Sequence, residues 1–314
     1  MLAVLEERGF PCKGLRAMAS SRSAGQELRF RGEPVLVEDV ARADLGGIDL
    51  ALFSAGAATS LEWAPRFAEA GALVVDNSSA WRRDPAVPLV VPEINMDVVE
   101  AGHRIIANPN CSTIQLVMVL GGLELAWGLE RVVVSTYQAV SGAGEKAVRE
   151  YRAQRDAGSQ EAPVMGRVIH ENVIPWIGKL SEDGYTDEEL KARDESRKIL
   201  RRPDLRVSCT CVRVPVVNGH SESVNVELRA PATLQELRLV IAALPGVQLL
   251  DDPGTKLFPV PREISGKDDV AVGRVRPDPS APNAFNLWIV GDNVRKGAAL
   301  NAVQIAEAWR DRFA

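Results

Sequence analysis

The chain has 314 residues, 46% hydrophobic and 25% charged, with a net charge of −5, as expected of a soluble globular protein of about two domains. The acidic balance argues against nucleic acid as the main partner, and no apolar run approaches the roughly 18 residues of a membrane span. Four cysteines and three histidines provide neither a disulfide framework nor an evident metal site, so we expect a reducing, cytoplasmic compartment.

The first elements predict the start of a dinucleotide-binding unit. Residues 1–8 are typical of the back half of a helix that Gly9 ends, and residues 15–19 of a short strand. The next loop is Ser20-Ser21-Arg22-Ser23-Ala24-Gly25. In a dinucleotide-binding fold this loop meets the adenosine ribose, where an acid accepts from a 2′-hydroxyl and an arginine accommodates a 2′-phosphate. Because the loop offers Arg22 and no acid, it favours NADP; an ordinary basic turn is the alternative.

Two further strands, at residues 48–54 and 73–76, alternate with helical segments and so predict a parallel α/β sheet. After the first strand, Ser54, Ala55 and Gly56 open a helix, and small residues there let backbone approach a phosphate or ribose closely. The second strand is followed by Asn77-Ser78-Ser79-Ala80-Trp81-Arg82-Arg83. The guanidinium of Arg82 suits bidentate anion binding, and Arg83 is interpreted as a solvated surface residue.

A strand at residues 104–107 runs into the turn Asn108-Pro109-Asn110. The apolar periodicity from Ile114 to Leu123 then predicts a helix that begins at Cys111. Unpaired N–H groups and the dipole at a helix start favour a thiolate, and they can hold the oxyanion formed when sulfur attacks a carbonyl. Cys111 is therefore a candidate nucleophile. A buried structural cysteine is the alternative, and it is the commoner fate of a lone cysteine.

The second half of the chain predicts a mixed α+β domain. Strands are expected at residues 131–140, 206–214, 223–228, 270–275 and 285–290, and helices at residues 145–155, 187–200, 234–243 and 298–313. Glu188 and Lys191 share one helix face, where such pairs are usually solvated. Arg213 and His220 flank a loop bent by proline and glycine, and histidine suits proton transfer near pH 7.

The segment Asn108-Pro109-Asn110-Cys111-Ser112-Thr113 closely resembles the active-site segment of aspartate-semialdehyde dehydrogenases. The resemblance extends in order along nearly the whole chain, and the matching segments are residues 20–25, 53–60, 76–82, 137–144, 188–191, 213–220 and 291–301. It implies a Rossmann-type NADP-binding domain, residues 1–110 and 292–314, and an α+β catalytic and dimerisation domain with a mixed sheet, residues 111–291. It also implies a homodimer or homotetramer.

The resemblance assigns roles to particular residues. Those expected to take part in catalysis are Cys111 as nucleophile, Gln138 as the group that orients the substrate, and His220 as acid–base. Those expected to bind the substrate are Arg82 and Lys191 at the phosphate, Glu188 at the amino group, Arg213 at the carboxylate, and Asn110. Those expected to border the cofactor are Ser20, Arg22, Ser23, Ser54, Ala55, Gly56, Ser141, Gly142, Gly144 and Asn293.

The implied reaction is the NADPH-dependent conversion of 4-phospho-L-aspartate to L-aspartate 4-semialdehyde through a thioester on Cys111, a step of amino-acid biosynthesis. One alternative is a related acyl-phosphate reductase, such as N-acetyl-γ-glutamyl-phosphate reductase. That family resembles Asn-Pro-Gly-Cys where this chain has Asn110 before the thiol. The other is a catalytically inactive relative, against which the intact Cys111, Gln138, Arg213 and His220 argue.

The N-terminus departs from the family pattern. Dinucleotide domains open with a strand, a Gly-rich turn and a helix, whereas residues 1–8 already resemble the middle of a helix. We expect an internal methionine taken as the start, with roughly 15–20 residues preceding it. We also expect the chain as given to bind NADPH poorly, to aggregate and to show little activity, because it would lack a central strand and the phosphate cradle.

Overall fold

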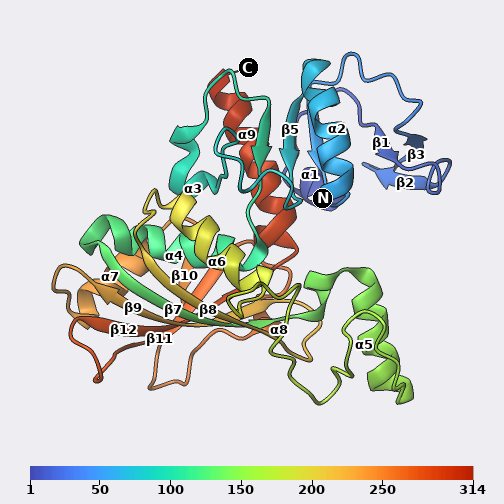
Figure 1. Cartoon of the computed structure of the whole chain (residues 1–314). Coiled ribbons are helices and arrows are strands. Elements are labelled where there is room, and N and C mark those ends of the chain that lie inside the picture. Colours follow the sequence, from blue (N-terminus) through green and yellow to red (C-terminus); the bar gives the residue numbers. More distant parts are fainter. Residues whose placement is uncertain (314) are drawn as a thin grey trace. The chain divides into compact units, whose positions relative to one another are not determined.

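Two units divide the chain in the computed structural model, which describes residues 1–313 (Figure 1). The first consists of Met1–Pro92, Met96–Asn108 and the residues from Ala299 onward, and the second of Glu93–Asn95 and Pro109–Ala298. Each unit has its own sheets and core, and each is described by itself.

The first unit contains two three-stranded sheets. One is parallel throughout, in the order β4 (Leu50–Phe53), β5 (Leu73–Asp76), β6 (Ile105–Ala107). The other places β3 (Glu33–Asp39) between β1 (Ala17–Ala19), its parallel partner, and β2 (Glu27–Phe30), its antiparallel partner. The sequence predicts β1, β4, β5 and β6 to within a few residues, and it misses the β2–β3 hairpin.

Helices cover both faces of the parallel sheet, as in a doubly wound fold. On one face, Val74 of β5 packs with Ala64 and Phe67 of α2 (Ala57–Glu69). On the other, Val75 packs with Ile305 of α9 (Leu300–Phe313). Because both faces are covered, every residue of β5 is buried.

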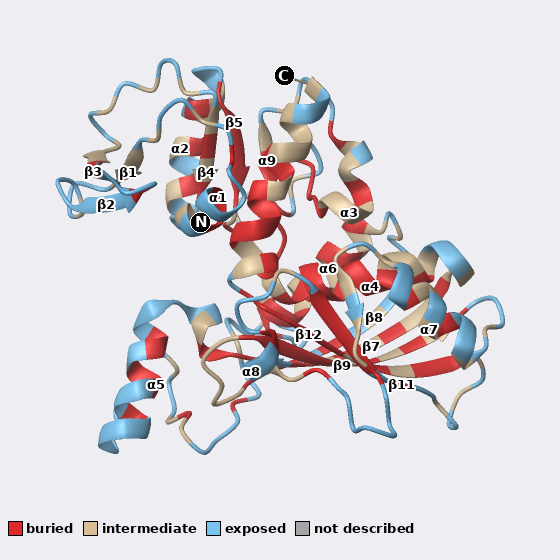
Figure 2. Ribbon diagram, turned by 180° about the vertical axis from the view of Figure 1, so that it is seen from behind, coloured by how far each residue is buried: buried red, intermediate tan, exposed pale blue. Residues whose placement is uncertain are grey.

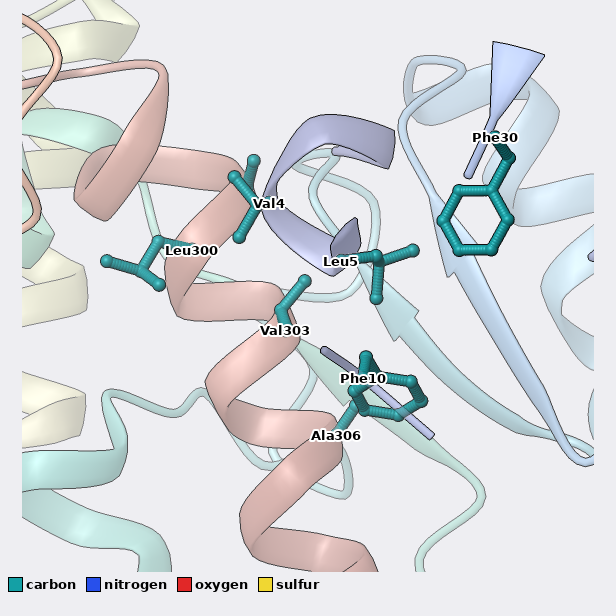
Figure 3. Packing of buried hydrophobic residues seen from close by; sticks show 8 residues of the cluster. Val4, Leu5, Phe10, Phe30, Leu300, Val303 and Ala306 are labelled. Carbon is teal, nitrogen blue, oxygen red and sulfur yellow. The ribbon is translucent and has the colours of Figure 1, made fainter. Parts of the chain in front are cut away.

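The N-terminal helix α1 (Leu2–Glu7) lies against α9, as Figure 3 shows. Val4 and Leu5 of α1 are buried in one apolar cluster with Leu300 and Val303. Gly9, predicted to end this helix, has a φ of 58°, a conformation that glycine adopts without strain.

A six-stranded mixed sheet is the centre of the second unit, in the order β10-β11-β12-β9-β7-β8. Its strands are β7 (Leu129–Gln138), β8 (Arg206–Arg213), β9 (His220–Leu228), β10 (Val247–Leu249), β11 (Val270–Pro277) and β12 (Ala284–Gly291). Pairs β7–β8 and β10–β11 are parallel, and the other neighbours are antiparallel. Strands β9 and β12 are largely buried (Figure 2).

Three of the longer helices contact this sheet, namely α4 (Cys111–Trp127), α6 (Asp187–Ile199) and α7 (Leu234–Ala243), and the short helix α8 (Pro261–Ile264) contacts β12. A fourth longer helix, α5 (Glu145–Ala157), follows the short helix η2 (Val140–Ala143). The remaining short helices are α3 (Pro92–Asn95), η1 (Met96–Val98) and the π-helix η3 (Arg295–Ala299). Within the described part of the chain, no helix combines the length and apolar character that crossing a bilayer requires.

The sheet register determines where the site forms. Gln138, the last residue of β7, lies opposite Arg213 on β8, and Gly291 of β12 lies opposite His220. Because Tyr137 pairs with Ser221, Gln138 and His220 are next neighbours across β7 and β9. The strand predicted at residues 223–228 begins three residues earlier: His220 is the first residue of β9 and accordingly has a fixed place in the ladder.

Candidate active site

Cys111 is the first residue of α4, as the sequence predicts. Asn110 is the N-cap, and its Oδ1 accepts from the N–H groups of Ser112 at 3.0 Å and Thr113 at 3.4 Å. This cap explains why the helix begins here. The cap thus engages these two first-turn N–H groups, and the expectation that backbone N–H groups at the helix start hold an oxyanion stays a prediction that concerns the others.

Helix α6 holds Asn110 at two points. The Asn110 backbone N–H donates to Oε2 of Glu195 at 2.6 Å, and its Nδ2 donates to Oε1 of Glu188 at 2.9 Å. The sequence reasoning missed Glu195, although its position seven residues after Glu188 puts both carboxylates on one helix face. The residue that precedes the thiol is therefore fixed by two buried acids.

His220 lies beside the thiol and is fully buried. Its Nε2 is 3.3 Å from Sγ of Cys111, and its Nδ1 accepts from the backbone N–H of Ala139 at 3.0 Å. Burial and the neighbouring charge of Arg213 lower the pKa of His220 to about 3, against a smaller opposing effect of Glu188. The ring is therefore neutral near pH 7.

Gln138 and Glu188 complete a polar cluster next to this pair. Gln138 Nε2 donates to Glu188 Oε1 at 3.1 Å, and Thr136 Oγ1 donates to Gln138 Oε1 at 3.2 Å. Burial alone would raise the pKa of Glu188. The charge of Lys191, whose Nζ is 3.0 Å from Oε2, and hydrogen bonds from Asn110 and Gln138 outweigh burial and lower that pKa to about 2. Glu188 is accordingly an anion at neutral pH.

Arg213 provides a buried cation in the same cluster. Its Nη1 donates to the carbonyl of Ala139 at 2.6 Å, so this one residue holds both Arg213 and His220 through its backbone. Gly142 lies directly over the two side chains. A Cβ at Gly142 would come within 3.0 Å of Arg213 Nη1 and 3.1 Å of His220 Nε2, closer than a Cβ normally packs, so a side chain here would require these neighbours to shift.

The predicted cofactor residues of the second unit are linked to each other. Asn293 is buried; its Nδ2 donates to Ser141 Oγ at 2.9 Å and its Oδ1 accepts from the Gly219 N–H at 2.9 Å. Gly142 follows Ser141 in η2, and Gly144 ends that helix with a φ of 87°. The structure thus brings Ser141, Gly142, Gly144 and Asn293 into one set of loops.

The loop after Asn293 also reaches the thiol. It forms a π-helix, a rare element often found at functional sites, and a Cβ on Gly297 would lie 3.0 Å from Cβ of Cys111. Lys296 beside it is buried, and its Nζ contacts both carboxylate oxygens of Glu93, at 2.7 and 2.8 Å.

The other predicted residues belong to the first unit. Those in exposed or half-buried loops at the carboxyl ends of parallel strands are Ser20, Arg22 and Ser23 after β1, and Ser54, Ala55 and Gly56 after β4. Gly56 caps α2 with a φ of 87°. Arg82 is buried, and its guanidinium donates to the carbonyls of Asn108 at 2.9 Å and Asn77 at 2.8 Å.

Comparisons with known proteins place these features in a family. Residues 1–101 match the family model "Semialdehyde dehydrogenase, NAD binding domain", and residues 120–296 match "Semialdehyde dehydrogenase, dimerisation domain". The chain is 46% identical to the aspartate-semialdehyde dehydrogenase of Bacillus subtilis (99% of this chain, 93% of the relative). It is 49% identical to that of Aquifex aeolicus (98% and 92%).

A solved structure gives the same answer. Aspartate semialdehyde dehydrogenase II from Vibrio cholerae superposes with a TM-score of 0.95 at 46% identity, covering 99% of this chain and 95% of that one. A Rossmann-like nucleotide-binding domain with a mixed-sheet dimerisation domain defines a semialdehyde dehydrogenase, an oxidoreductase that uses NAD(P). The chain belongs to the aspartate-semialdehyde dehydrogenase family. The predicted family, fold class and enzyme class are confirmed.

Proposed function

We propose that this chain converts 4-phospho-L-aspartate to L-aspartate 4-semialdehyde with NADPH as reductant. The observation that carries the proposal is the 3.3 Å contact between the Cys111 thiol and His220 at the start of α4. A relative with a TM-score of 0.95, an aspartate semialdehyde dehydrogenase from Vibrio cholerae, was solved complexed with ASA. The proposed reaction is a step of amino-acid biosynthesis.

In the reaction, Sγ of Cys111 attacks the acyl carbon of the substrate. The S–C bond forms, the C–O bond to phosphate breaks, and phosphate leaves with the electron pair, so that a thioester remains on Cys111. NADPH, when bound, supplies the hydride that reduces this thioester. The tetrahedral product then expels Sγ and releases the semialdehyde. A thioester suits this sequence because it accepts hydride and its sulfur leaves readily.

The buried charges match the three charged groups of the substrate. Arg213 offers a guanidinium for the α-carboxylate, and anionic Glu188 offers a partner for the α-ammonium group. Lys191, 3.0 Å from Glu188, and Arg82 provide cations for the phosphate. Gln138 orients the reacting carbonyl, and Asn110 contributes by holding the helix that presents the thiol.

The residues present fit a dinucleotide. Gly56, with its φ of 87°, exposes backbone at the start of α2, where a helix N-terminus suits phosphate. Arg22 is exposed in the loop after β1, where it can meet a 2′-phosphate, and this favours NADP over NAD. The loop of Ser141 and Asn293 would border the nicotinamide half.

We further infer a domain division in which residues 1–110 and 292–314 bind NADP and residues 111–291 carry catalysis and dimerisation. The matched dimerisation domain supports a homodimer or homotetramer. A cytoplasmic location agrees with four cysteines that are all free thiols.

The test is phosphate-dependent reduction of NADP⁺, followed by absorbance, with L-aspartate semialdehyde and with N-acetyl-L-glutamate semialdehyde as substrates. We expect the turnover that the chain shows, however small, to require the first substrate and to be faster with NADP⁺ than with NAD⁺. Preference for the N-acetylated substrate would replace the proposal with the related acyl-phosphate reductase. No turnover together with an iodoacetamide-resistant Cys111 would mean a catalytically inactive relative.

A further inference from the structure

Lys296, in the π-helix η3, is only 1% exposed, a degree of burial that lysine almost never reaches unless its ammonium group is paired. Its Nζ donates to both carboxylate oxygens of one acid, to Oε1 of Glu93 at 2.8 Å and to Oε2 at 2.7 Å. The pair takes no part in the binding of substrate or cofactor proposed above. Lys296 nevertheless immediately precedes Gly297, the residue of η3 that packs against the thiol residue.

The acid of this pair lies against α4, the helix that begins with the thiol. Glu93 belongs to the part of α3 that lies in the second unit. The next residue, Ile94, packs on α4, since a Cβ on Gly121 would come within 2.8 Å of its Cδ1. Gly246 lies beside both elements: a Cβ there would be 3.7 Å from Oε1 of Glu93 and 2.9 Å from Cε of Met118, which is also on α4. The partner of Lys296 is therefore fixed to α4.

The other side of Lys296 leads directly to the nucleophile. A Cβ on Gly297 would lie 3.0 Å from Cβ of Cys111 and 3.4 Å from its Cα, so the backbone of η3 packs directly on Cys111. The Gly297 N–H donates to the carbonyl of Asp292 at 3.0 Å, which holds the first turn of η3. Because Sγ of Cys111 is in turn 3.3 Å from His220, a displacement of η3 would change how the thiol meets that ring.

The adjacent residue of η3 forms an ion pair of a different kind. Nε of Arg295 is 2.7 Å from Asp268, in the loop before β11, and the two side chains are 20% and 43% exposed. The corresponding values for Lys296 and Glu93 are 2% and 13%. Exposed pairs contribute little, whereas loss of one partner of a buried pair strongly perturbs its surroundings. The two pairs on one short helix therefore provide a matched comparison.

We propose that Lys296 is a positioning residue for Cys111. By pairing with Glu93, it ties η3 to α3 and, through the packing of α3, to α4. The backbone of Gly297 consequently keeps its place against Cys111, and Sγ keeps its contact with His220. The inference rests on the proposed function in that Cys111 is the nucleophile. In this role Lys296 acts through Gly297 and not on the substrate.

The first test follows alkylation of Cys111 by iodoacetamide as a function of pH, well below the melting temperature of each variant. Mass spectrometry separates Cys111 from Cys12, which is also half-buried. In Glu93→Gln we expect the rate at pH 7 to fall about tenfold and the profile to shift to higher pH, because a thiolate that loses a hydrogen-bonding neighbour is less stabilised. The control is Asp268→Asn, the same change at the acid that pairs with Arg295, and it should match the parent.

Gly297→Ala tests the contact itself. Gly297 does not have a positive φ, so alanine acts here through its Cβ and not through backbone strain. We expect its alkylation profile to change in the same direction as that of Glu93→Gln. A parent-like profile in Gly297→Ala, or equal profiles in Glu93→Gln and Asp268→Asn, would overturn the proposal.

The second test is a double-mutant cycle of Lys296→Met and Glu93→Gln. Lys296→Met leaves Glu93 buried without this cation, whereas the double variant loses both charges together and should fold even where the single variant does not. If the two side chains act as one unit, the double variant should alkylate Cys111 no more slowly than Glu93→Gln alone. Additive losses would show that the two residues act independently and would contradict the proposal.

Steady-state kinetics distinguish positioning from binding. The kcat of Glu93→Gln should fall about ten- to a hundredfold with KM within about threefold, the effect expected when a nucleophile is misplaced by up to about 1 Å. A raised KM at unchanged kcat would place the pair in substrate binding and overturn the positioning role. Alkylation requires no turnover, so a parent chain whose Cys111 reacts but which reduces no NADP⁺ would refute the proposed function, while the alkylation profiles would still decide this inference.

Discussion

The two units prepare their sites in different ways. In the second unit the thiol, His220, Glu188 and Arg213 are partly or fully buried, and each already has a defined polar contact. In the first unit the loops that follow β1 and β4 are largely exposed, and backbone conformation shapes them, as at Gly56. If the proposed function holds, this difference predicts that the chemistry depends on preorganised side chains, while cofactor choice depends on a few exposed groups.

The sharpest test of this contrast is Cys111→Ser. Turnover should fall at least about a thousandfold, because an alcohol of ordinary acidity cannot replace a thiolate. NADPH binding, measured by fluorescence titration, should be unchanged, because Cys111 is not among the residues expected to border the cofactor. Activity within about tenfold of the parent would remove Cys111 from the mechanism.

Arg22→Asp tests the exposed loop after β1 in the first unit. The ratio of kcat/KM for NADPH to that for NADH should fall about ten- to a hundredfold, because an acid repels a 2′-phosphate and can accept from a 2′-hydroxyl. The rate of Cys111 alkylation by iodoacetamide should not change. Arg83→Asp, at an exposed arginine without a predicted cofactor role, is the control. A constant preference ratio would make Arg22 a turn residue only.

How far these features could be predicted from sequence depends on how local they are. The helix start at Cys111 was predictable, because a polar turn and an apolar period of 3.6 both point to it. The position of His220 was not: its bond to the Ala139 amide depends on the register of β7 and β9, which no local pattern encodes. Glu195 shares a helix face with Glu188, but only the packing of α6 reveals that this face meets Asn110.

The missed β2–β3 hairpin has a similar explanation. Pro34 within β3 argues against a strand in a local reading, and β2 has only four residues, too few to predict a strand from their pattern. The strand β3 nonetheless forms because it pairs with β1 on one side and β2 on the other. Pairing between distant segments, not propensity, decides this element.

Glu195→Ala tests how much the reactivity of the Cys111 thiol depends on a residue that acts only through Asn110. Loss of the acceptor for the Asn110 N–H should slow iodoacetamide alkylation and lower kcat about tenfold, with KM little changed. Glu195→Gln keeps an acceptor oxygen and should recover most of the loss. If both variants alkylate Cys111 at the parent rate, the contact serves folding alone.

Glu188 predicts how the second unit responds to acid. Its folded pKa of about 2 lies below its ordinary value of 4.5, so its contribution to stability is fully present above pH 4.5 and is lost as the pH falls toward 2. Glu188→Gln should therefore flatten the decrease of the melting temperature between pH 4.5 and 2.5. Asp183→Asn, on a fully exposed loop acid, is the control and should leave most of that decrease in place. If the melting temperature of Glu188→Gln falls as steeply between pH 4.5 and 2.5 as that of the parent, the pair of Glu188 with Lys191 is not the cause of the acid sensitivity.

The smallest expected effect compares two equivalent helix caps. Thr186 begins α6 and Thr233 begins α7, and each forms a capping box with the glutamate three residues later. Either substitution to alanine should cost about 1 kcal/mol of unfolding free energy, measured in urea. Only Thr186→Ala should also change Cys111 alkylation, about two- to threefold, because α6 carries the two acids that hold Asn110. Equal alkylation in the two variants would mean that Glu188 and Glu195 hold Asn110 even when the first turn of α6 frays.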